Sequence, residues 1–308
     1  MHQISGRWKL GFALALTTSI LWGTLPIALK VAVERVDPQT VTWLRFLVSG
    51  TVLGLVLAAR GTLPALAPLT RVDWILIAIS LAGLLGNYLT FLHALRYLSP
   101  TVNQVLIQLA PMFLLLGGVA LFRERLHAAQ RAGVAALVLG LLLFFNQRLV
   151  NLHAQSAGFA LGVGLLVIAA LSWAVYGLAQ KLLLRSLGSQ QILLIMYVGA
   201  TVVLLPMTHP SELAQVSTRH VVALIYCSAN TLLSYGAFVA ALEHWEVSRV
   251  SAVLATAPIF TLIAASLAQG LWPGLVPLEP LNAVSLLGAL VVVAGSIASA
   301  LGGRSGAA

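Results

Sequence analysis

The feature that most constrains the fold is a succession of ten long apolar runs that fills almost the whole chain. They lie at roughly 10–29, 39–59, 73–95, 101–121, 130–146, 157–179, 189–206, 219–242, 249–269 and 281–302. A transmembrane helix needs roughly 20 apolar residues, and most runs reach that length, whereas 130–146 and 189–206 are shorter. Backbone polar groups must be satisfied internally in lipid, and runs this continuous suit helices better than alternating barrel strands. The pattern predicts an all-α integral membrane protein with ten transmembrane helices.

The scarcity of charge supports this fold class. Only 8% of the 308 residues are charged and 60% are hydrophobic, whereas a soluble domain is about one quarter charged. These values exclude a cytosolic enzyme, a secreted domain and a disordered chain. The net charge of +9 comes from basic residues scattered between apolar runs, which is typical of topology determinants rather than of a nucleic-acid-binding face. The expected partners are a small-molecule substrate and the lipid bilayer, with no nucleic acid and no assigned oligomeric state.

The distribution of basic residues predicts the orientation in the membrane. Of the 17 Lys and Arg residues, eleven fall on the side of both chain ends, five fall on the opposite side, and Arg45 lies inside the second run. The positive-inside rule places the richer side in the cytoplasm. We therefore expect a multi-pass inner-membrane protein with cytoplasmic N- and C-termini and a cytoplasmic tail at 303–308. Arg7 and Lys9 precede a first run that is longer than a signal-peptide core, which predicts a retained helix.

The two halves of the chain carry the same uncommon residues in the same order. Trp22 and Lys30 recur as Trp173 and Lys181, Tyr88 and Pro111 recur as Tyr235 and Pro258, and Glu124, Gly133 and Gly140 recur as Glu279, Gly288 and Gly295. Each half holds five runs, an odd number, so the second half must enter the membrane from the opposite side. The sequence predicts two inverted-topology five-helix repeats, 1–146 and 157–302, joined by a loop at 147–156. Such repeats recur in secondary transporters, which bind substrate near the midplane.

Short motifs accompany this repeat: Trp22–Gly23, Arg45–Phe46, Pro111 and Pro258, and the stretch 124–126 followed by Gly133 and Gly140. With these motifs the chain resembles the EamA-type members of the drug/metabolite transporter superfamily over nearly its whole length. The resemblance implies a ten-helix carrier with a central cavity lined by helices one, three, four, six, eight and nine, and with helices five and ten at the periphery. It implies substrates among amino acids, other small metabolites, nucleotide sugars and drugs. The seventh run lacks an Arg-Phe counterpart, so a role for Arg45 is confined to one half.

Polar and aromatic residues inside the runs are the candidate site, because such groups usually face the bundle interior or a wet cavity. Gln104, Gln108 and Pro111 share one helical face, and each intramembrane proline removes a backbone hydrogen bond. The predicted substrate-binding residues are Trp22, Asn87, Tyr88, Asn103, Gln104, Gln108, Trp173, Tyr176, Asn230, Ser234, Tyr235 and Thr256, and the predicted gating or kink positions are Pro111 and Pro258. Interhelical hydrogen bonding and packing explain the same residues equally well.

Four ionisable residues are candidates for a proton or anion role: His93, Arg45, Lys30 and Lys181. The two lysines end their helices, where snorkelling to the headgroups is the simpler interpretation, and a lone His is more often a packing residue. Arg45 is the most costly because a guanidinium does not deprotonate in proteins. It requires the interface, a carboxylate, a ring of carbonyls or an anionic substrate. All eight Asp and Glu residues lie in loops or at helix ends, which disfavours a proton antiporter built around a deep carboxylate.

The sequence contains no Walker loop, no His and Cys with metal spacing and no nucleophile elbow. We therefore expect no enzyme activity, no cofactor and no metal. The sequence predicts a secondary carrier that moves a small organic metabolite across the inner membrane by alternating access. An exporter of amino acids or similar amphipathic solutes is the leading interpretation, and the direction is implied by the resemblance alone. A channel, a non-transporting scaffold and an integral-membrane lipid enzyme are the alternatives.

Overall fold

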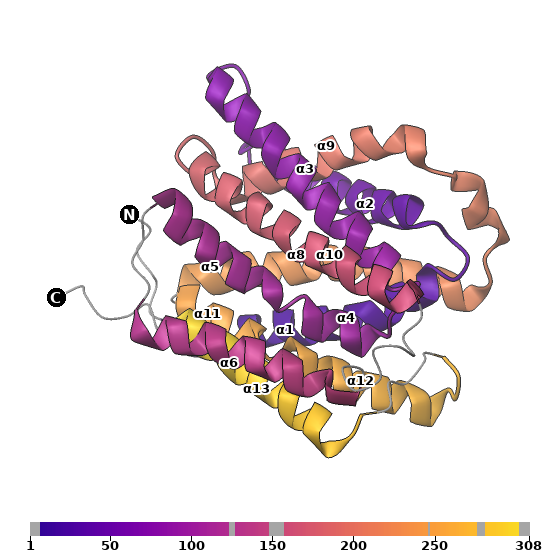
Figure 1. Cartoon of the computed structure of the whole chain (residues 1–308). Helices are drawn as coiled ribbons and strands as arrows, with labels where there is room; N and C mark the ends of the chain where they lie inside the picture. Colours follow the sequence, from indigo (N-terminus) through magenta and orange to yellow (C-terminus); the bar gives the residue numbers. More distant parts are fainter. Residues whose placement is uncertain (1–6, 123–126, 148–156, 246, 276–280, 302–308) are drawn as a thin grey trace.

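The computed structural model describes residues 7–122, 127–147, 157–245, 247–275 and 281–301, and within these ranges every regular element is a helix (Figure 1). The uninterrupted long helices are α1 (Trp8–Ala32), α2 (Pro38–Ala59), α3 (Arg71–Ala94), α8 (Ala157–Leu183), α9 (Ser189–Leu204) and α10 (Thr218–His244). Two further spans are interrupted, as α4 (Pro100–Leu106) with α5 (Leu109–Phe122) and as α11 (Val247–Leu254) with α12 (Ala257–Leu271). The remaining helices are α6 (Ala128–Phe144), α13 (Ala283–Leu301) and two short 3-10 turns, η2 (Leu205–Met207) and η3 (Pro210–Gln215).

Eight helical stretches of the described chain are long and apolar enough to cross a membrane. They include Ser189–Met207, where η2 extends a run that was predicted to be short. Ala128–Phe144 is a shorter apolar helix, as its sequence suggested. Ala283–Ser299 is also shorter, although its apolar run, 281–302, has the length of a span. The all-helical architecture and these apolar spans confirm the prediction of an all-α integral membrane protein.

The runs 101–121 and 249–269 differ from the prediction because each is two helices rather than one. Pro111 lies in the first turn of α5, and Pro258 in the first turn of α12. A proline has no N–H to donate to the carbonyl four residues earlier, and its ring crowds that carbonyl. The carbonyl of Ile107 accepts instead from the N–H of Ala110, three residues on, at 2.9 Å. The helical ladder is therefore interrupted at 107–108 and at 255–256.

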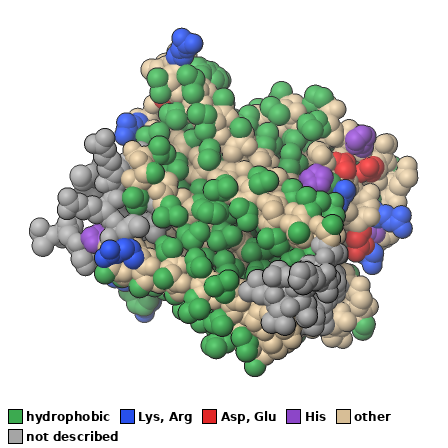
Figure 2. All heavy atoms as spheres, in the orientation of Figure 1, with side chains coloured by type: hydrophobic (Ala, Val, Ile, Leu, Met, Phe, Trp, Pro, Cys, Tyr) green, Lys and Arg blue, Asp and Glu red, His purple; other side chains and the backbone are tan. Residues whose placement is uncertain are grey.

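The surface of the bundle is apolar around its middle and charged at its ends (Figure 2). Leu55, Val202 and Ile225 are each more than 60% exposed, whereas small polar side chains such as Thr18 and Ser234 are fully buried. This reversal of the soluble pattern is what an apolar solvent selects. The helix ends carry ordinary polar caps, such as the Thr70 capping box at the start of α3, because the chain returns to water there.

Glycines permit the closest helix contact, between α6 and α13, which lie side by side in Figure 1. Gly140 lies against the backbone of Gly288 and Val292, and Gly133 lies against that of Gly295. The earlier residue of α6 meets the later residue of α13, so the two helices run antiparallel. Small residues allow such backbone approach in membranes, where van der Waals contact drives helix association.

We expect Gly140→Ala to destabilise the protein, because the added Cβ would lie 2.5 Å from the backbone nitrogen of Val292. Overpacking of this kind costs about 1–3 kcal/mol. Gly164→Ala is the matched control, since a Cβ there meets nothing within 4 Å, and Ala is the better helix former. Thermal unfolding in detergent measures both. Equal melting temperatures for the two variants would contradict the close α6–α13 contact.

Candidate functional site

A group of aromatic and polar side chains joins five helices in the interior of the bundle. We call it the central cluster: Trp22 of α1, Arg45 and Phe46 of α2, Tyr88 of α3, Tyr197 of α9, and Thr231, Ser234 and Tyr235 of α10. Four of these residues, Trp22, Tyr88, Ser234 and Tyr235, were predicted to bind substrate. Helices α2 and α9 also contribute, although the family resemblance does not place them at the cavity.

The predicted members of the cluster contact one another directly. Trp22 donates from Nε1 to Ser234 Oγ at 3.0 Å, and its ring meets that of Tyr235 edge-on with centroids 5.6 Å apart. The hydroxyl of Tyr88 donates to the hydroxyl of Tyr235 at 3.4 Å. Trp22, on α1, is thus connected to α3 through α10 by aromatic side chains in contact with one another.

Arg45 lies inside this cluster with only 3% of its surface exposed. Its Nε donates to Thr231 Oγ1 at 2.9 Å, and its guanidinium carbon lies 4.8 Å from the centroid of the Tyr88 ring. None of the described acidic residues pairs with it. Arg45 therefore does not reach the interface by snorkelling, and its cation–π contact with Tyr88 offsets part of the charge without neutralising it.

A second polar group lies where the two interrupted spans meet. Gln108, at the end of the α4–α5 break, donates from Nε2 to the carbonyl of Ala255 in the α11–α12 break at 3.3 Å. Thr256 Oγ1 lies 3.0 Å from Ser19 Oγ of α1. The predicted kink positions, Pro111 and Pro258, each lie within three residues of a break. The two breaks therefore lie against each other inside the bundle.

Other predicted residues bond to the backbone of a neighbouring segment. Asn87 donates to the carbonyl of Ala169 at 2.9 Å, Asn103 to that of Phe91 at 3.1 Å, and Asn230 to that of Leu21 at 2.7 Å. This is the packing role that the sequence left open. Gln104 is buried beside them, Tyr176 is buried in the core that includes Phe46 and Tyr197, and Trp173 packs against that core.

The candidate ionisable residues other than Arg45 lie near helix ends. Lys30 donates its ammonium protons to the carbonyls of Leu95 and Leu98, which follow the end of α3. A cation at a helix C-terminus is favoured by the exposed carbonyls and the helix dipole. His93 lies in the last turn of α3 and is half-buried. Lys181 lies in the last turn of α8 and is exposed.

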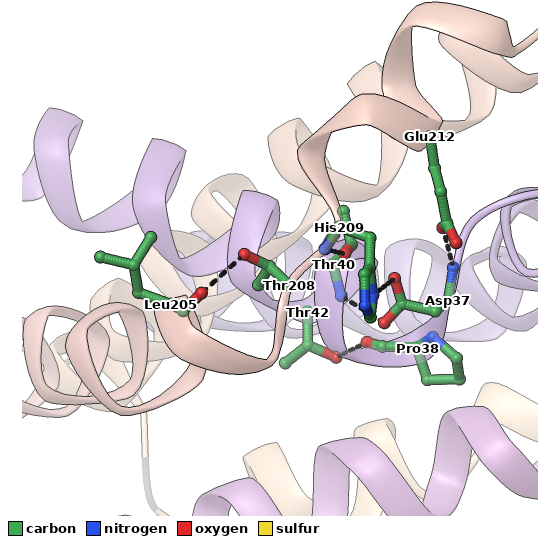
Figure 3. A network of polar contacts seen from close by, with 8 residues as sticks. All are labelled: Asp37, Pro38, Thr40, Thr42, Leu205, Thr208, His209 and Glu212. Carbon is green, nitrogen blue, oxygen red and sulfur yellow. Dashed lines mark hydrogen bonds and ion pairs between the residues drawn. The ribbon is translucent and has the colours of Figure 1, made fainter.

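Polar contacts close the bundle where the α1–α2 loop meets η3, which we call the η3 end (Figure 3). The backbone N–H of Asp37 donates to Glu212 Oε2 at 2.8 Å, and that of His209 donates to Thr40 Oγ1 at 2.8 Å. Burial acts to raise the pKa of the Asp37 carboxyl, but hydrogen bonds led by those from Thr40 outweigh it and lower this pKa below its ordinary value. The Asp37 carboxylate is thus a fixed negative cap at the start of α2.

The η3 end also brings together three side chains that could bind a cation. Asp37, His209 and Glu212 offer three ligand atoms within 4.8 Å of one another, and such oxygen and nitrogen donors suit a divalent metal. Backbone N–H groups already occupy an oxygen of each carboxylate, and these bonds are sufficient to explain the arrangement. Sequence spacing did not indicate the cluster because 175 positions separate Asp37 from Glu212.

A pocket of about 730 Å³ lies beside the α11–α12 break. It is lined by Phe12, Leu16, Trp245, Arg249, Ala252, Val253, Thr256, Ile259, Phe260 and Ile297. Its walls are therefore almost wholly apolar, with Arg249 as the charged member. Thr256 is the one predicted site residue in its lining, and its bond to Ser19 connects the pocket wall to α1.

Sequence reasoning missed Phe46, Tyr197 and Thr231 as members of the central cluster. Phe46 stacks on Tyr197 with centroids 5.5 Å apart, and these residues are 151 positions apart, the same offset as Trp22 and Trp173. That offset was the signal that could have identified Tyr197. Thr231 carried no signal, because a lone threonine in an apolar helix usually bonds its own backbone, as Thr231 also does to Cys227.

The outward apolar belt, the interior polar groups and the facing helix breaks define a polytopic membrane protein of the transporter type. The sequence profile described as the EamA-like transporter family matches residues 9–146 and 160–301. The chain therefore belongs to this family, as the sequence resemblance suggested.

Relatives with related names extend over almost the full chain. The "Uncharacterized inner membrane transporter YhbE" of Escherichia coli (strain K12) is 41% identical over 99% of this chain and 94% of its own length. The "Probable amino-acid metabolite efflux pump" of Salmonella typhimurium is 25% identical over 96% of each chain. A solved crystal structure aligns with a TM-score of 0.65 over 96% of this chain and 97% of its own, at 19% identity, which supports the fold alone. The protein is an integral inner-membrane transporter.

We expect Arg45→Met to leave the melting temperature of the ligand-free protein unchanged or raised. Replacing even a buried ion pair by apolar side chains of similar volume is often neutral or stabilising, because the charges no longer have to be desolvated. A buried charge without a carboxylate partner has less attraction to lose, and Thr231 keeps its bond to the carbonyl of Cys227. Lys30→Met is the comparison, and should lower the melting temperature because it strips the carbonyls of Leu95 and Leu98 of their donor. A loss of stability in Arg45→Met as large as in Lys30→Met would assign Arg45 a structural role.

Proposed function

We propose that the protein is a secondary carrier that moves a small organic metabolite across the inner membrane by alternating access. Exported amphipathic solutes, such as amino acids or their metabolites, are the proposed substrates. The observation that carries the proposal is the pair of facing helix breaks, joined by the bond from Gln108 to Ala255. Discontinuous helices at the interface of two repeats form the substrate region of many carriers. The names of the Salmonella and Escherichia coli efflux-pump relatives agree with this substrate class.

We also propose that the halves 1–146 and 157–302 are inverted repeats related by a two-fold axis in the membrane plane. Equivalent residues of two such repeats can touch only close to their axis. Three equivalent pairs do so: Tyr88 with Tyr235, Gln108 with Ala255, and Phe46 with Tyr197. The antiparallel contact of α6 with α13, which are the fifth helices of the two halves, supports the same axis. This gives ten spans, with α6 and α13 as the short fifth and tenth.

The η3 end has the properties required of a closure that opens during transport. Several of its polar contacts join the first half to the second: Asp37 with Glu212, Thr40 with His209, and Glu34 with Arg219 and His220. Exposed ion pairs are worth only about 0–1 kcal/mol each, so breaking these contacts to open the η3 end costs little free energy. With cytoplasmic termini, as the basic residues predict, the η3 end faces away from the cytoplasm.

Counterflow in proteoliposomes tests the carrier proposal and its site together. Unlabelled solute on the far side should accelerate the exchange of labelled solute, which a channel does not do. We expect Trp22→Ala to reduce counterflow by about tenfold, because losing its ring contact with Tyr235 and its bond to Ser234 is worth about 1.4 kcal/mol. Gln108→Ala should also impair it. Trp74→Ala is the control, since Trp74 is 47% exposed on the outer surface of α3. Equal loss of membrane abundance in Trp22→Ala and of transport would favour a packing role.

Weakening the η3 end should favour the state that is open on that side. We expect Glu34→Gln combined with Glu212→Gln to increase the labelling rate of Thr42→Cys about two- to fivefold. The two changes remove the ionic contacts of Glu34 with Arg219 and His220, and the charge of the carboxylate that accepts the Asp37 N–H. Thr42 is fully buried one turn below the closure (Figure 3). Cys227→Ser removes the one native cysteine, and a cysteine at the exposed Gln215 is the reference. An unchanged Thr42 rate with a membrane-impermeant thiol reagent would exclude the η3 end as a gate.

A further inference from the structure

Arg45 carries a permanent charge in a place where the protein does not neutralise it. Its guanidinium remains protonated at all relevant pH values, and only 3% of the residue surface is exposed. Buried ions are otherwise paired or ligated. Among the residues that the structure describes, the hydrogen-bonding partner of Arg45 is the hydroxyl of Thr231. The charge is therefore available to something that this chain does not itself supply.

The geometry of the contacts shows which part of the guanidinium is available. Tyr88 covers the flat face of the group, at 4.8 Å from ring centroid to guanidinium carbon, and Thr231 takes Nε. The N–H groups of Nη1 and Nη2 point along the edge of the plane, and no described acceptor bonds to them. Two parallel N–H groups at such an edge match the two oxygens of a carboxylate.

The surroundings favour a carboxylate over other anions. A phosphate monoester carries close to two charges and is usually held by several cations. Among the lysines and arginines that the structure describes, Lys30 is the other one that is not exposed, and its ammonium donates to the carbonyls of Leu95 and Leu98. Arg45 thus offers a single positive charge and one fork, which balances a single carboxylate.

The aromatic side chains beside Arg45 indicate the chemistry of the uncharged part of the ligand. From Tyr88 the rings continue to Tyr235 and to Trp22, with the Tyr235 and Trp22 centroids 5.6 Å apart. Phe46 packs on Tyr88 with centroids 4.6 Å apart. Such rings suit an aromatic or branched apolar body. The described acidic residues Glu34, Asp37, Asp73 and Glu212 lie at helix ends or in loops, so none stands ready to pair with a ligand ammonium.

We propose that Arg45 binds the carboxylate of the transported solute, and that the substrates are monocarboxylates with an apolar or aromatic body. The carboxylate is required and an α-ammonium is dispensable. This inference rests on the proposed carrier function, which it narrows to one class of solute and one anchoring residue.

A matched panel of ligands tests the proposal on the unmodified protein. The panel is L-phenylalanine, 3-phenylpropionate, phenethylamine and L-phenylalaninamide, with L-leucine as a second body. Thermal shift and calorimetry in detergent measure binding, and counterflow measures transport. The carboxylates should bind with or without the ammonium, and phenethylamine and the amide should bind about 10- to 100-fold more weakly, as the loss of a charged hydrogen-bonded pair predicts. Equal or tighter binding of the amine or the amide, or no binding of any carboxylate, overturns the proposal.

Two variants assign the effect to Arg45. Arg45→Gln should lose the preference for carboxylate over amide, and Arg45→Lys should restore part of it, since an ammonium keeps the charge without the fork. Arg60→Gln removes the same charge from the exposed end of α2 and should keep wild-type selectivity. A carboxylate preference that persists in a folded Arg45→Gln protein overturns the assignment.

The outcomes separate this inference from the carrier proposal. Carboxylate binding that depends on Arg45 without any counterflow would support the anchor and refute the carrier. Counterflow of the amine or amide in preference to the carboxylates would support the carrier and refute the anchor.

Discussion

In a solvent without hydrogen-bonding partners, each polar group must find its partner within the chain, and this requirement governs the whole structure. The backbone meets it by forming helices. The side chains of Asn87 and Asn230 meet it by bonding to the carbonyls of a neighbouring helix. Lys30 meets it at the carbonyls beyond the end of α3. Arg45 meets it only in part, and its incomplete pairing is the reason to place ligand chemistry beside it rather than beside the other polar residues.

Equivalent positions of the two halves contribute unequally to the interior. Phe46 faces Tyr197, but the position of Arg45 is occupied by Met196 in the second half. Gln108 donates to the backbone carbonyl of Ala255, whose methyl side chain cannot form a hydrogen bond in return. A solute bound to Arg45 as proposed would therefore have one orientation, because only one half offers a guanidinium to its charged end.

The helices could be predicted from the sequence because a helix that crosses the lipid core must be apolar over its whole length. The run 130–146 was correctly identified as short. It did not predict the interruptions of the fourth and ninth spans, since a membrane proline can kink a helix without ending it. Trp22, Tyr88, Ser234 and Tyr235 could be selected because polar and aromatic groups are rare in lipid, and they contact one another. Thr231 could not be selected, and Arg45 had no assignable partner, because those contacts depend on how α2 packs against α10. The interpretation of Asn87 and Asn103 stayed open until their backbone acceptors were located.

The glycine contact between α6 and α13 has a mechanical consequence. Backbones that touch without side chains between them have no room to approach and no flexible groups to absorb a shift. In the proposed carrier, relative motion of the two halves would leave this contact nearly in place, with α6 and α13 as the pivot. Small rotations about it would then become larger displacements at the distant η3 end, where the polar contacts are weak.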